Sequence, residues 1–140
     1  SSLRKEKVSK ISSKIAIFSF IRNFVNKQQR AIVKKMLQKH HGCVIDGRDI
    51  GSKVFKDAKI KLFINVKLEI RAKRRHKQLI ELGEKSIYSE ILKEIKLRDK
   101  QDKNRKNSPL IIPKGAFIID NSYNFKFTKK EVNKALNHLK

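Results

Sequence analysis

The chain has 140 residues, of which 39% are hydrophobic, and its formal net charge is +23 at pH 7. A chain of this length fits one domain, and folding can bury roughly two-thirds of the surface that the unfolded chain exposes. No apolar run approaches about 18 residues, so a membrane-spanning helix is excluded. The single cysteine, Cys43, cannot form an internal disulfide and favours a reducing, cytoplasmic setting. The four histidines lack the spacing of a zinc site.

The high positive charge favours a negatively charged partner, and two interpretations of it stay open. The lysines are spread along the whole chain, which indicates a general lysine bias together with an attraction for phosphate-bearing ligands. The other interpretation is a stand-alone basic module that binds RNA or another polyanion. Against it, the chain has no Trp, its two Tyr residues are isolated and most of its Phe positions look buried. We therefore expect no dedicated nucleic-acid partner.

The first half of the chain changes from a helical to a strand pattern. Residues 5–39 have apolar residues at helical spacing with an interruption at Ser19, which predicts two helices joined by a bend. Residues 43–45 form a short β-branched run that predicts a strand buried on both faces. A charged loop rich in glycine follows at 46–51, and residues 59–66 predict a second strand.

A pair of helices is predicted next. Residues 68–82 have the pattern of a basic helix, and Gly83 is a suitable residue to end it. Ser86 is predicted to cap the following helix, which continues to Arg98 and beyond.

The C-terminal part returns to the strand pattern and then to a helix. Residues 109–113 lie between two prolines and are predicted to be extended, and residues 116–120 predict a third strand. The segment Thr128-Lys129-Lys130-Glu131 has the form of a capping box and predicts the start of a final helix. The alternation of strands and helices predicts an α/β fold with a parallel sheet.

Five arginines are placed on the two middle helices. Arg71, Arg74 and Arg75 fall at i, i+3 and i+4, so they share a helix face, and such a group repels itself unless an anion lies among them. A solvated basic face is the alternative for these three alone. Because Arg98 and Arg105 follow on the next helix, the five together favour a lid that closes over phosphates.

The loop at 46–51 carries an acid, a base and a second acid. Asp46 stands at the end of an apolar strand, where nucleotide-binding α/β folds place an acid associated with a metal. A simple turn before Gly47 is the alternative. Arg48 is suited to bind phosphate, and Asp49 is suited to accept a hydrogen bond from an exocyclic amine such as cytosine N4. Charged loops are usually solvated, so each of these signals is weak by itself.

These motifs, in this order, resemble those of the bacterial cytidylate kinase family. The segments that carry the resemblance are Gly47-Arg48-Asp49-Ile50-Gly51, similar to the family's G-R-D-x-G loop, Arg71-Ala72-Lys73-Arg74-Arg75, similar to its R-A-x-R-R lid helix, and Arg98-Asp99-x-x-Asp102-x-x-Arg105, similar to its R-D-x-x-D-x-x-R segment. The resemblance implies the fold of a P-loop nucleoside monophosphate kinase, a parallel sheet flanked by helices. It also implies phosphate transfer from ATP to CMP or dCMP.

The resemblance further implies which residues bind the substrate. Ser13, Arg22 and Asp49 would read the cytosine, Arg98 and Asp102 would hold the sugar, and Arg48 and Arg105 would grip the phosphate of CMP.

For the catalytic step, Arg71, Arg74 and Arg75 would close onto the transferring phosphoryl group. Mg²⁺ would arrive with ATP, without a direct protein ligand, and Asp46 would approach it through water.

The match covers residues 1–140 as one partial cytidylate kinase-like domain, with CMP-binding helices over 1–40 and lid helices over 67–108. The family's first strands and its glycine-rich ATP-binding loop have no counterpart in the sequence. We therefore expect an incomplete fold that is inactive alone, and an inactive kinase remnant is a further interpretation. For the complete protein the resemblance implies a cytoplasmic, monomeric enzyme of pyrimidine nucleotide metabolism.

Overall fold

The computed structural model describes residues 6–139, with the side chains at positions 6, 7, 9, 10, 13 and 139 outside the described part. Its elements in chain order are α1 (Glu6–Ile15), α2 (Ser19–Leu37), the π-helical turn η2 (Ile50–Val54), β1 (Leu62–Asn65), α3 (Leu68–Glu81), α4 (Tyr88–Asn104), β2 (Phe117–Asp120), α5 (Phe125–Leu136) and the short η3 (Asn137–Leu139). None of the described helices is long and apolar enough to cross a membrane.

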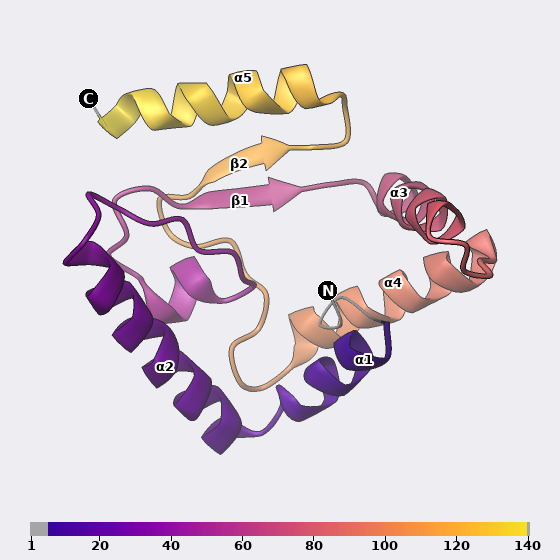
Figure 1. Cartoon of the computed structure of the whole chain (residues 1–140), viewed down its shortest axis with the longest axis horizontal. Coiled ribbons are helices and arrows are strands. Elements are labelled where there is room, and N and C mark those ends of the chain that lie inside the picture. Colours follow the sequence, from indigo (N-terminus) through magenta and orange to yellow (C-terminus); the bar gives the residue numbers. More distant parts are fainter. Residues whose placement is uncertain (1–5, 140) are drawn as a thin grey trace.

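The two strands form a parallel pair, which confirms the predicted α/β class and the predicted strands around 59–66 and 116–120 (Figure 1). Parallel strands need a long crossover connection, and α3 and α4 supply it. α5 packs on β2, where Ile119 and Ala135 are each 2% exposed. Ile64 of β1 lies in register with Ile119 but remains 48% exposed. The described chain therefore covers only part of the strand pair.

A small apolar core joins α3 to α4. Ala72 and Leu79 from α3 are buried together with Ile91 from α4, and Tyr88 packs against them at the edge. Burying a Leu or Ile side chain stabilises a fold by roughly 1.5–3 kcal/mol, so this cluster fixes the pairing of the two helices. Between them Gly83 adopts a positive φ of 72°, as predicted for the residue that ends α3.

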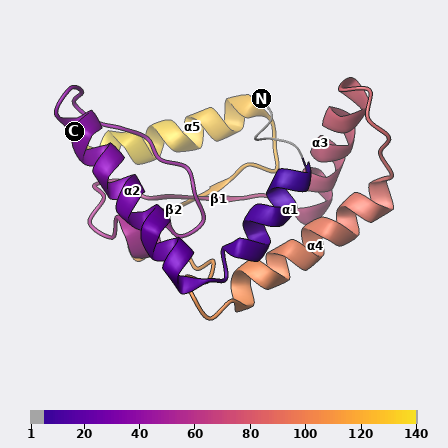
Figure 2. The same ribbon diagram turned by 60° about the horizontal axis from the view of Figure 1, so that its bottom comes forward.

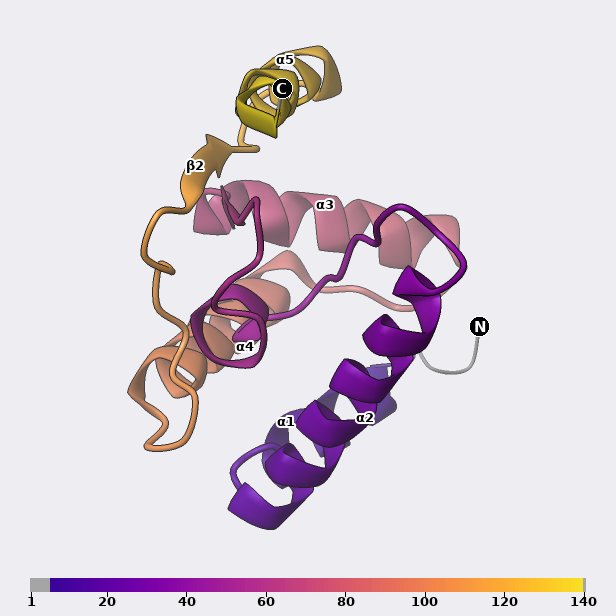
Figure 3. The same ribbon diagram turned by 90° about the vertical axis from the view of Figure 1, so that its left-hand side faces the viewer.

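The α1–α2 corner lies beside the C-terminal end of α4 (Figure 2). The predicted bend near Ser19 is confirmed, because α1 ends at Ile15 and α2 begins at Ser19. The side-chain amide of Asn107, just after α4, donates to the carbonyl oxygen of Ile17 in the corner at 3.5 Å. α5 lies on the opposite side of the strand pair from this corner (Figures 1 and 3).

The prediction of a buried strand at 43–45 is wrong. These residues have no assigned secondary structure, Cys43 is exposed and Val44 is 103% exposed. A strand is stable only when a neighbouring strand accepts and donates its backbone hydrogen bonds. Within the described residues only β1 and β2 pair, so this segment has no such neighbour.

The predicted cap at Ser86 is also wrong. α4 begins one residue later than a Ser86 cap requires, with Ile87 at the N-cap position and no side-chain cap bond. The Ser86 hydroxyl instead pairs with Nδ1 of His76 on α3 at 2.7 Å. The Ser86 hydroxyl therefore bonds to the facing helix α3 and does not cap α4, which is the role that the local sequence predicted.

The final helix begins earlier than the predicted capping box at 128–131. Asn124 is the N-cap of α5, and its side-chain oxygen accepts from the backbone N–H of Phe127 at 2.9 Å. Thr128 therefore lies inside the helix, where its hydroxyl donates to the side-chain oxygen of Asn121 at 2.9 Å. Asn is as good an N-cap as Thr or better, which explains why the earlier start is preferred.

The expectation that most Phe side chains are buried is wrong as well. Those that are exposed are Phe18, Phe20, Phe24, Phe125 and Phe127, and Tyr123 is 57% exposed. They lie on α2, in the turn before it and at the start of α5, on surfaces against which no other described element packs.

Candidate functional site

A cavity of about 350 Å³ lies between the α1–α2 corner, the loop before η2 and the C-terminal end of α4. The charged side chains that line it are Arg22, Arg48, Asp49, Arg98, Asp102 and Arg105. The structure thus brings together six of the seven residues that the sequence pointed to for substrate binding. A larger, more open hollow of about 650 Å³ lies on α5, and its charged lining consists of lysines on the helix surface.

Arg22, in the first turn of α2, connects the corner to the loop. Its Nη2 donates to a carboxylate oxygen of Asp49, and its Nη1 donates to the carbonyl oxygen of Ala16 at 3.3 Å. The side chains of Arg22 and Asp49 are only 12% and 11% exposed. A buried charge pair of this kind holds both groups in fixed positions at the cavity wall.

The backbone around η2 fixes the position of Asp49. The Asp49 carbonyl oxygen accepts from the backbone N–H of Lys53 at 2.9 Å and of Val54 at 3.2 Å. Gly47 packs so tightly that an added Cβ would lie 2.5 Å from Cγ1 of Ile50. A side chain at position 47 would force Ile50 or the loop to shift, so packing favours glycine before Arg48 and Asp49.

Asp102, near the end of α4, lies between two guanidinium groups. Its Oδ2 is 2.5 Å from Nε of Arg48, and its Oδ1 accepts from Nη1 of Arg105 at 3.2 Å. Asp102 is 6% exposed, and its carbonyl oxygen accepts from the backbone N–H of Leu110 at 2.7 Å. The chain therefore folds back over the end of α4, and Nε of Arg105 donates to the carbonyl oxygen of Ser108 within that turn.

The cavity has an excess of positive charge, because four guanidinium groups face two carboxylates. Burial lowers the pKa of Arg105, and the positive charge of Arg22 lowers it further. Burial likewise lowers the pKa of Arg98, and Arg48 adds to the effect. Burial is the larger cause of both shifts and a neighbouring guanidinium is the second, and an anion between these groups would offset both effects.

Two buried donors at the cavity also have no hydrogen-bond partner: Nε of Arg22 and Nη2 of Arg105. Buried polar groups are nearly always paired, so unpaired guanidinium nitrogens at a cavity wall indicate a ligand that accepts hydrogen bonds. Phosphate and other oxyanions fit this description best.

The five arginines predicted to form one lid do not gather in one place. Arg71 donates to Asp99, Arg74 donates to the carbonyl oxygen of Tyr123 at 3.1 Å, and Arg75 donates to the side chain of Gln78 at 2.9 Å. Only Arg98 and Arg105 line the cavity. Each arginine of α3 thus has a partner inside the protein, on α4 for Arg71, in the turn before α5 for Arg74 and on α3 itself for Arg75. Their closing over a phosphate stays a prediction.

Two other candidate residues, Asp46 and Ser13, are not among the described side chains that line the cavity. Asp46 is exposed in the loop and does not line the cavity. The side chain of Ser13 is outside the described part, although its neighbour Ser12 contributes to the lining. Among the described residues no three or more His, Cys, Asp or Glu side chains gather into a group that could hold a metal ion.

Sequence reasoning missed Asn26, which lines the cavity and is only 8% exposed. Asn26 and Gln29 lie four and seven residues after Arg22, so the three share one face of α2. The signal was present in the sequence as a polar stripe at helical spacing on an otherwise apolar face.

The fold and the cavity together define a class of protein: a small α/β protein with parallel strands, consistent with a nucleotide kinase, whose helices line an arginine-rich cavity. A family model described as cytidylate kinase matches residues 1–139. The chain is 44% identical to the cytidylate kinase of Rickettsia felis and 45% identical to that of Rickettsia conorii. Each match covers 120 residues, which is 86% of this chain and 53% of the relative.

The chain belongs to the cytidylate kinase family. It spans about half the length of the curated relatives that it matches.

Proposed function

We propose that the protein to which this chain belongs transfers a phosphoryl group from ATP to CMP or dCMP, and that the cavity at the α1–α2 corner binds the nucleotide acceptor. The observation that supports this proposal is the meeting of six charged residues from three separate segments around one cavity. The family membership, the excess positive charge and the unpaired donors all agree with a phosphate-bearing substrate.

The pair of Arg22 and Asp49 would read the cytosine, together with Ser13. Cytosine carries a donor at N4 beside the acceptors N3 and O2. A guanidinium hydrogen-bonded to a carboxylate presents the complementary pattern. Because the two side chains are already held by each other, little conformational freedom would be lost on binding.

Arg105 and Arg48 would bind the phosphate of CMP, and Arg98 and Asp102 would hold the sugar. Asp102 already orients both phosphate-binding arginines through its two oxygens. The unpaired Nη2 of Arg105 then gives the phosphate a donor that needs no rearrangement of the protein.

Arg71, Arg74 and Arg75 would act on the transferring phosphoryl group after leaving their present partners. In this reading the Arg71–Asp99 pair is the resting arrangement of the helices over 67–108. Mg²⁺ supplies charge neutralisation for the phosphates of ATP. The ion would keep water and phosphate ligands, with Asp46 near it through water.

The test is an assay of ADP formation with CMP, dCMP, UMP and AMP as acceptors, using the protein with any residues that precede Ser1. We expect CMP and dCMP to be preferred, Arg105→Ala to abolish turnover and Asp49→Ala to lose the preference for cytosine. Lys27→Ala, on an exposed position of α2, is the matched control and should leave turnover unchanged. Full selectivity in Asp49→Ala would contradict the assignment of the cavity.

The same assay separates the other interpretations. We propose that the 140-residue chain alone does not turn over CMP, since its strand pair and exposed apolar faces lack cover within the described residues. Binding of CMP without turnover by the longer protein would favour an inactive remnant. Turnover by the 140-residue chain would overturn the proposal that it is inactive alone.

A further inference from the structure

We propose that α5 and the segment just before it form a binding surface for single-stranded nucleic acid. α5 carries four lysines, Lys126, Lys129, Lys130 and Lys134, and its one carboxylate is Glu131. All four lysines line the hollow of about 650 Å³ on this helix. Glu131 forms an ion pair with Lys134 at 2.7 Å, so the helix keeps an excess of three positive charges. Such an excess along one helix is the electrostatic footprint of a polyphosphate ligand.

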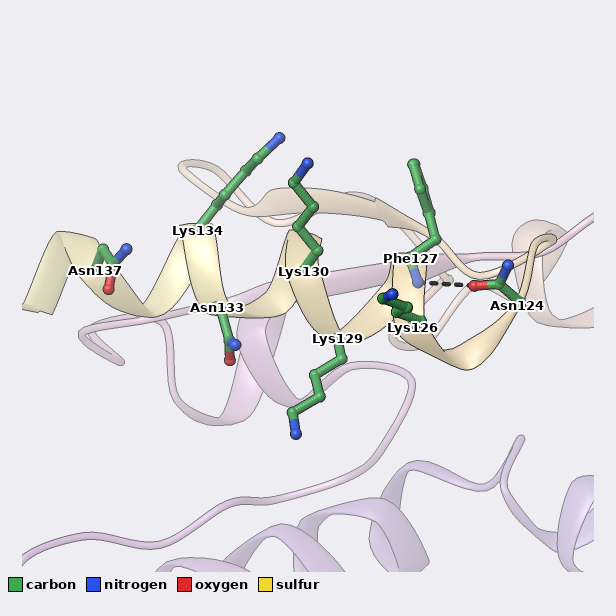
Figure 4. Close-up of a pocket in the computed structure, with 8 residues that line it drawn as sticks. All are labelled: Asn124, Lys126, Phe127, Lys129, Lys130, Asn133, Lys134 and Asn137. Carbon is green, nitrogen blue, oxygen red and sulfur yellow. Dashed lines mark hydrogen bonds between the residues drawn. The ribbon is translucent and has the colours of Figure 1, made fainter.

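The side chains that line the hollow extend to both sides of the helix (Figure 4). Lys130, Lys134 and Phe127 extend to one side, whereas Lys129 and Asn133 extend to the other. α5 has 12 residues, so this surface is about 18 Å long. A phosphate backbone that lies along the helix would therefore have ammonium groups on both flanks.

Exposed aromatic rings stand at the N-terminal end of the same surface. Phe125 is 80% exposed, and the rings of Tyr123 and Phe127 pack with their centroids 5.0 Å apart. Arg74 of α3 donates to the carbonyl oxygen of Tyr123 and so holds this turn in place. Single-strand binding combines a basic groove with aromatic rings on which bases stack, and this end of α5 supplies both lysines and rings.

An anionic lipid surface is a poorer fit for the same charge. A helix that lies on a membrane inserts an apolar face into the bilayer. The apolar face of α5 is already packed on β2, where Ala135 is 2% exposed. Apart from Leu136, which is 42% exposed, the side chains that remain outside are mainly lysine, asparagine and a few rings, which suits a flexible polyanion. The surface also lies on the opposite side of the strand pair from the nucleotide cavity, so this inference does not rest on the proposed kinase activity (Figure 3).

The test is fluorescence anisotropy of a labelled oligo(dT) of about 12 nucleotides, titrated with the protein including any residues that precede Ser1, between about 0.05 and about 0.5 M salt. One variant replaces Lys126, Lys129, Lys130 and Lys134 with Gln. The matched control replaces the same number of exposed lysines on and just after α2, namely Lys27, Lys34, Lys35 and Lys39. The two variants have equal net charge, so a difference in their affinity for the oligonucleotide shows which of the two surfaces binds it.

We expect the α5 variant to bind far more weakly and to reduce the slope of log affinity against log salt by about 3, because each contacted phosphate contributes about 0.7 for single strands. The α2 control should keep most of the affinity. Phe125→Ala should weaken binding about tenfold, the effect of one stacked base. Phe20→Ala, which removes a ring that is 71% exposed on α2, should have little effect.

Equal losses in the two lysine variants would show attraction by net charge alone and would overturn the proposal. The same holds if wild-type binding disappears completely at moderate salt with no effect of Phe125→Ala. Circular dichroism of each variant identifies any loss of binding that comes from unfolding.

Discussion

Arg71 of α3 and Asp99 of α4 are joined by two parallel hydrogen bonds, with Nη1–Oδ1 at 2.8 Å and Nη2–Oδ2 at 2.5 Å. This bidentate pair connects the two helices beyond their small apolar core. It also occupies the arginine that the family resemblance assigns to the phosphoryl group. The pair therefore links the stability of the helix hairpin to the availability of Arg71.

Asp99→Asn should weaken the α3–α4 hairpin in a pH-dependent way. The hydrogen bonds from Arg71 hold the pKa of Asp99 below its ordinary value of 3.8. Because the folded-state pKa is the lower one, the stabilisation is fully present above the unfolded value and is lost as pH falls through the folded value. Above about pH 5, amide hydrogen exchange should show a free energy of local opening of α3 that is about 1 kcal/mol higher in the wild type than in Asp99→Asn.

The difference between wild type and Asp99→Asn should shrink as pH falls below 3.8 and vanish once Asp99 is protonated in the folded state. Glu90→Gln makes the same change of charge on α4, at a position without an assigned ion pair, and should have a much smaller effect. A difference that stays constant with pH would mean that Asp99 does not act through its charge.

Gly47→Ala should impair nucleotide binding by displacing the loop that carries Arg48 and Asp49. The added methyl group would lie 2.5 Å from Cγ1 of Ile50, so the loop must move, at a cost of roughly 1–3 kcal/mol. Calorimetric titration of the longer protein with CMP should show at least about a tenfold loss of affinity. Gly42→Ala is the matched control, because nothing lies within 4 Å of its added methyl group.

Asp102→Asn should change the binding of CMP and of inorganic phosphate in opposite directions. The substitution removes the carboxylate that holds Arg48 and Arg105, so CMP should lose its oriented phosphate and sugar contacts. The cavity also becomes more positive, so a simple phosphate ion should bind more tightly, with a stronger dependence on salt. Titrations with both ligands test this, and parallel losses would indicate that the cavity has collapsed.

The overall fold and much of the cavity were predictable because their signals are local or motif-based. The two parallel strands and the helices α3 and α4 follow from apolar periodicity, and Gly83 ends α3 as expected. The residues Arg22, Asp49 and Arg105 are far apart in sequence, and only the family motifs indicated that they belong to one site.

What could not be predicted depends on contacts between distant segments. Ser86 has the chemistry of an N-cap, but a histidine on the facing helix takes its hydroxyl. Arg71 lies on a face that suggested an anion site, but Asp99 of the next helix is its partner. Asn26 shares a helix face with Arg22, which the sequence shows, but its place in the cavity depends on α4 and the loop before η2.

The exposed segment at 43–45 gives the last prediction. Cys43 is exposed in an extended stretch without a strand partner, so its thiol should react with a disulfide reagent as fast in the folded 140-residue chain as in denaturant. Absorbance of the released thiolate measures both rates. A slow native rate would show that 43–45 is covered in solution. Slow reaction only in the longer protein would show that additional chain packs over this segment and supplies the backbone partner that the described residues lack.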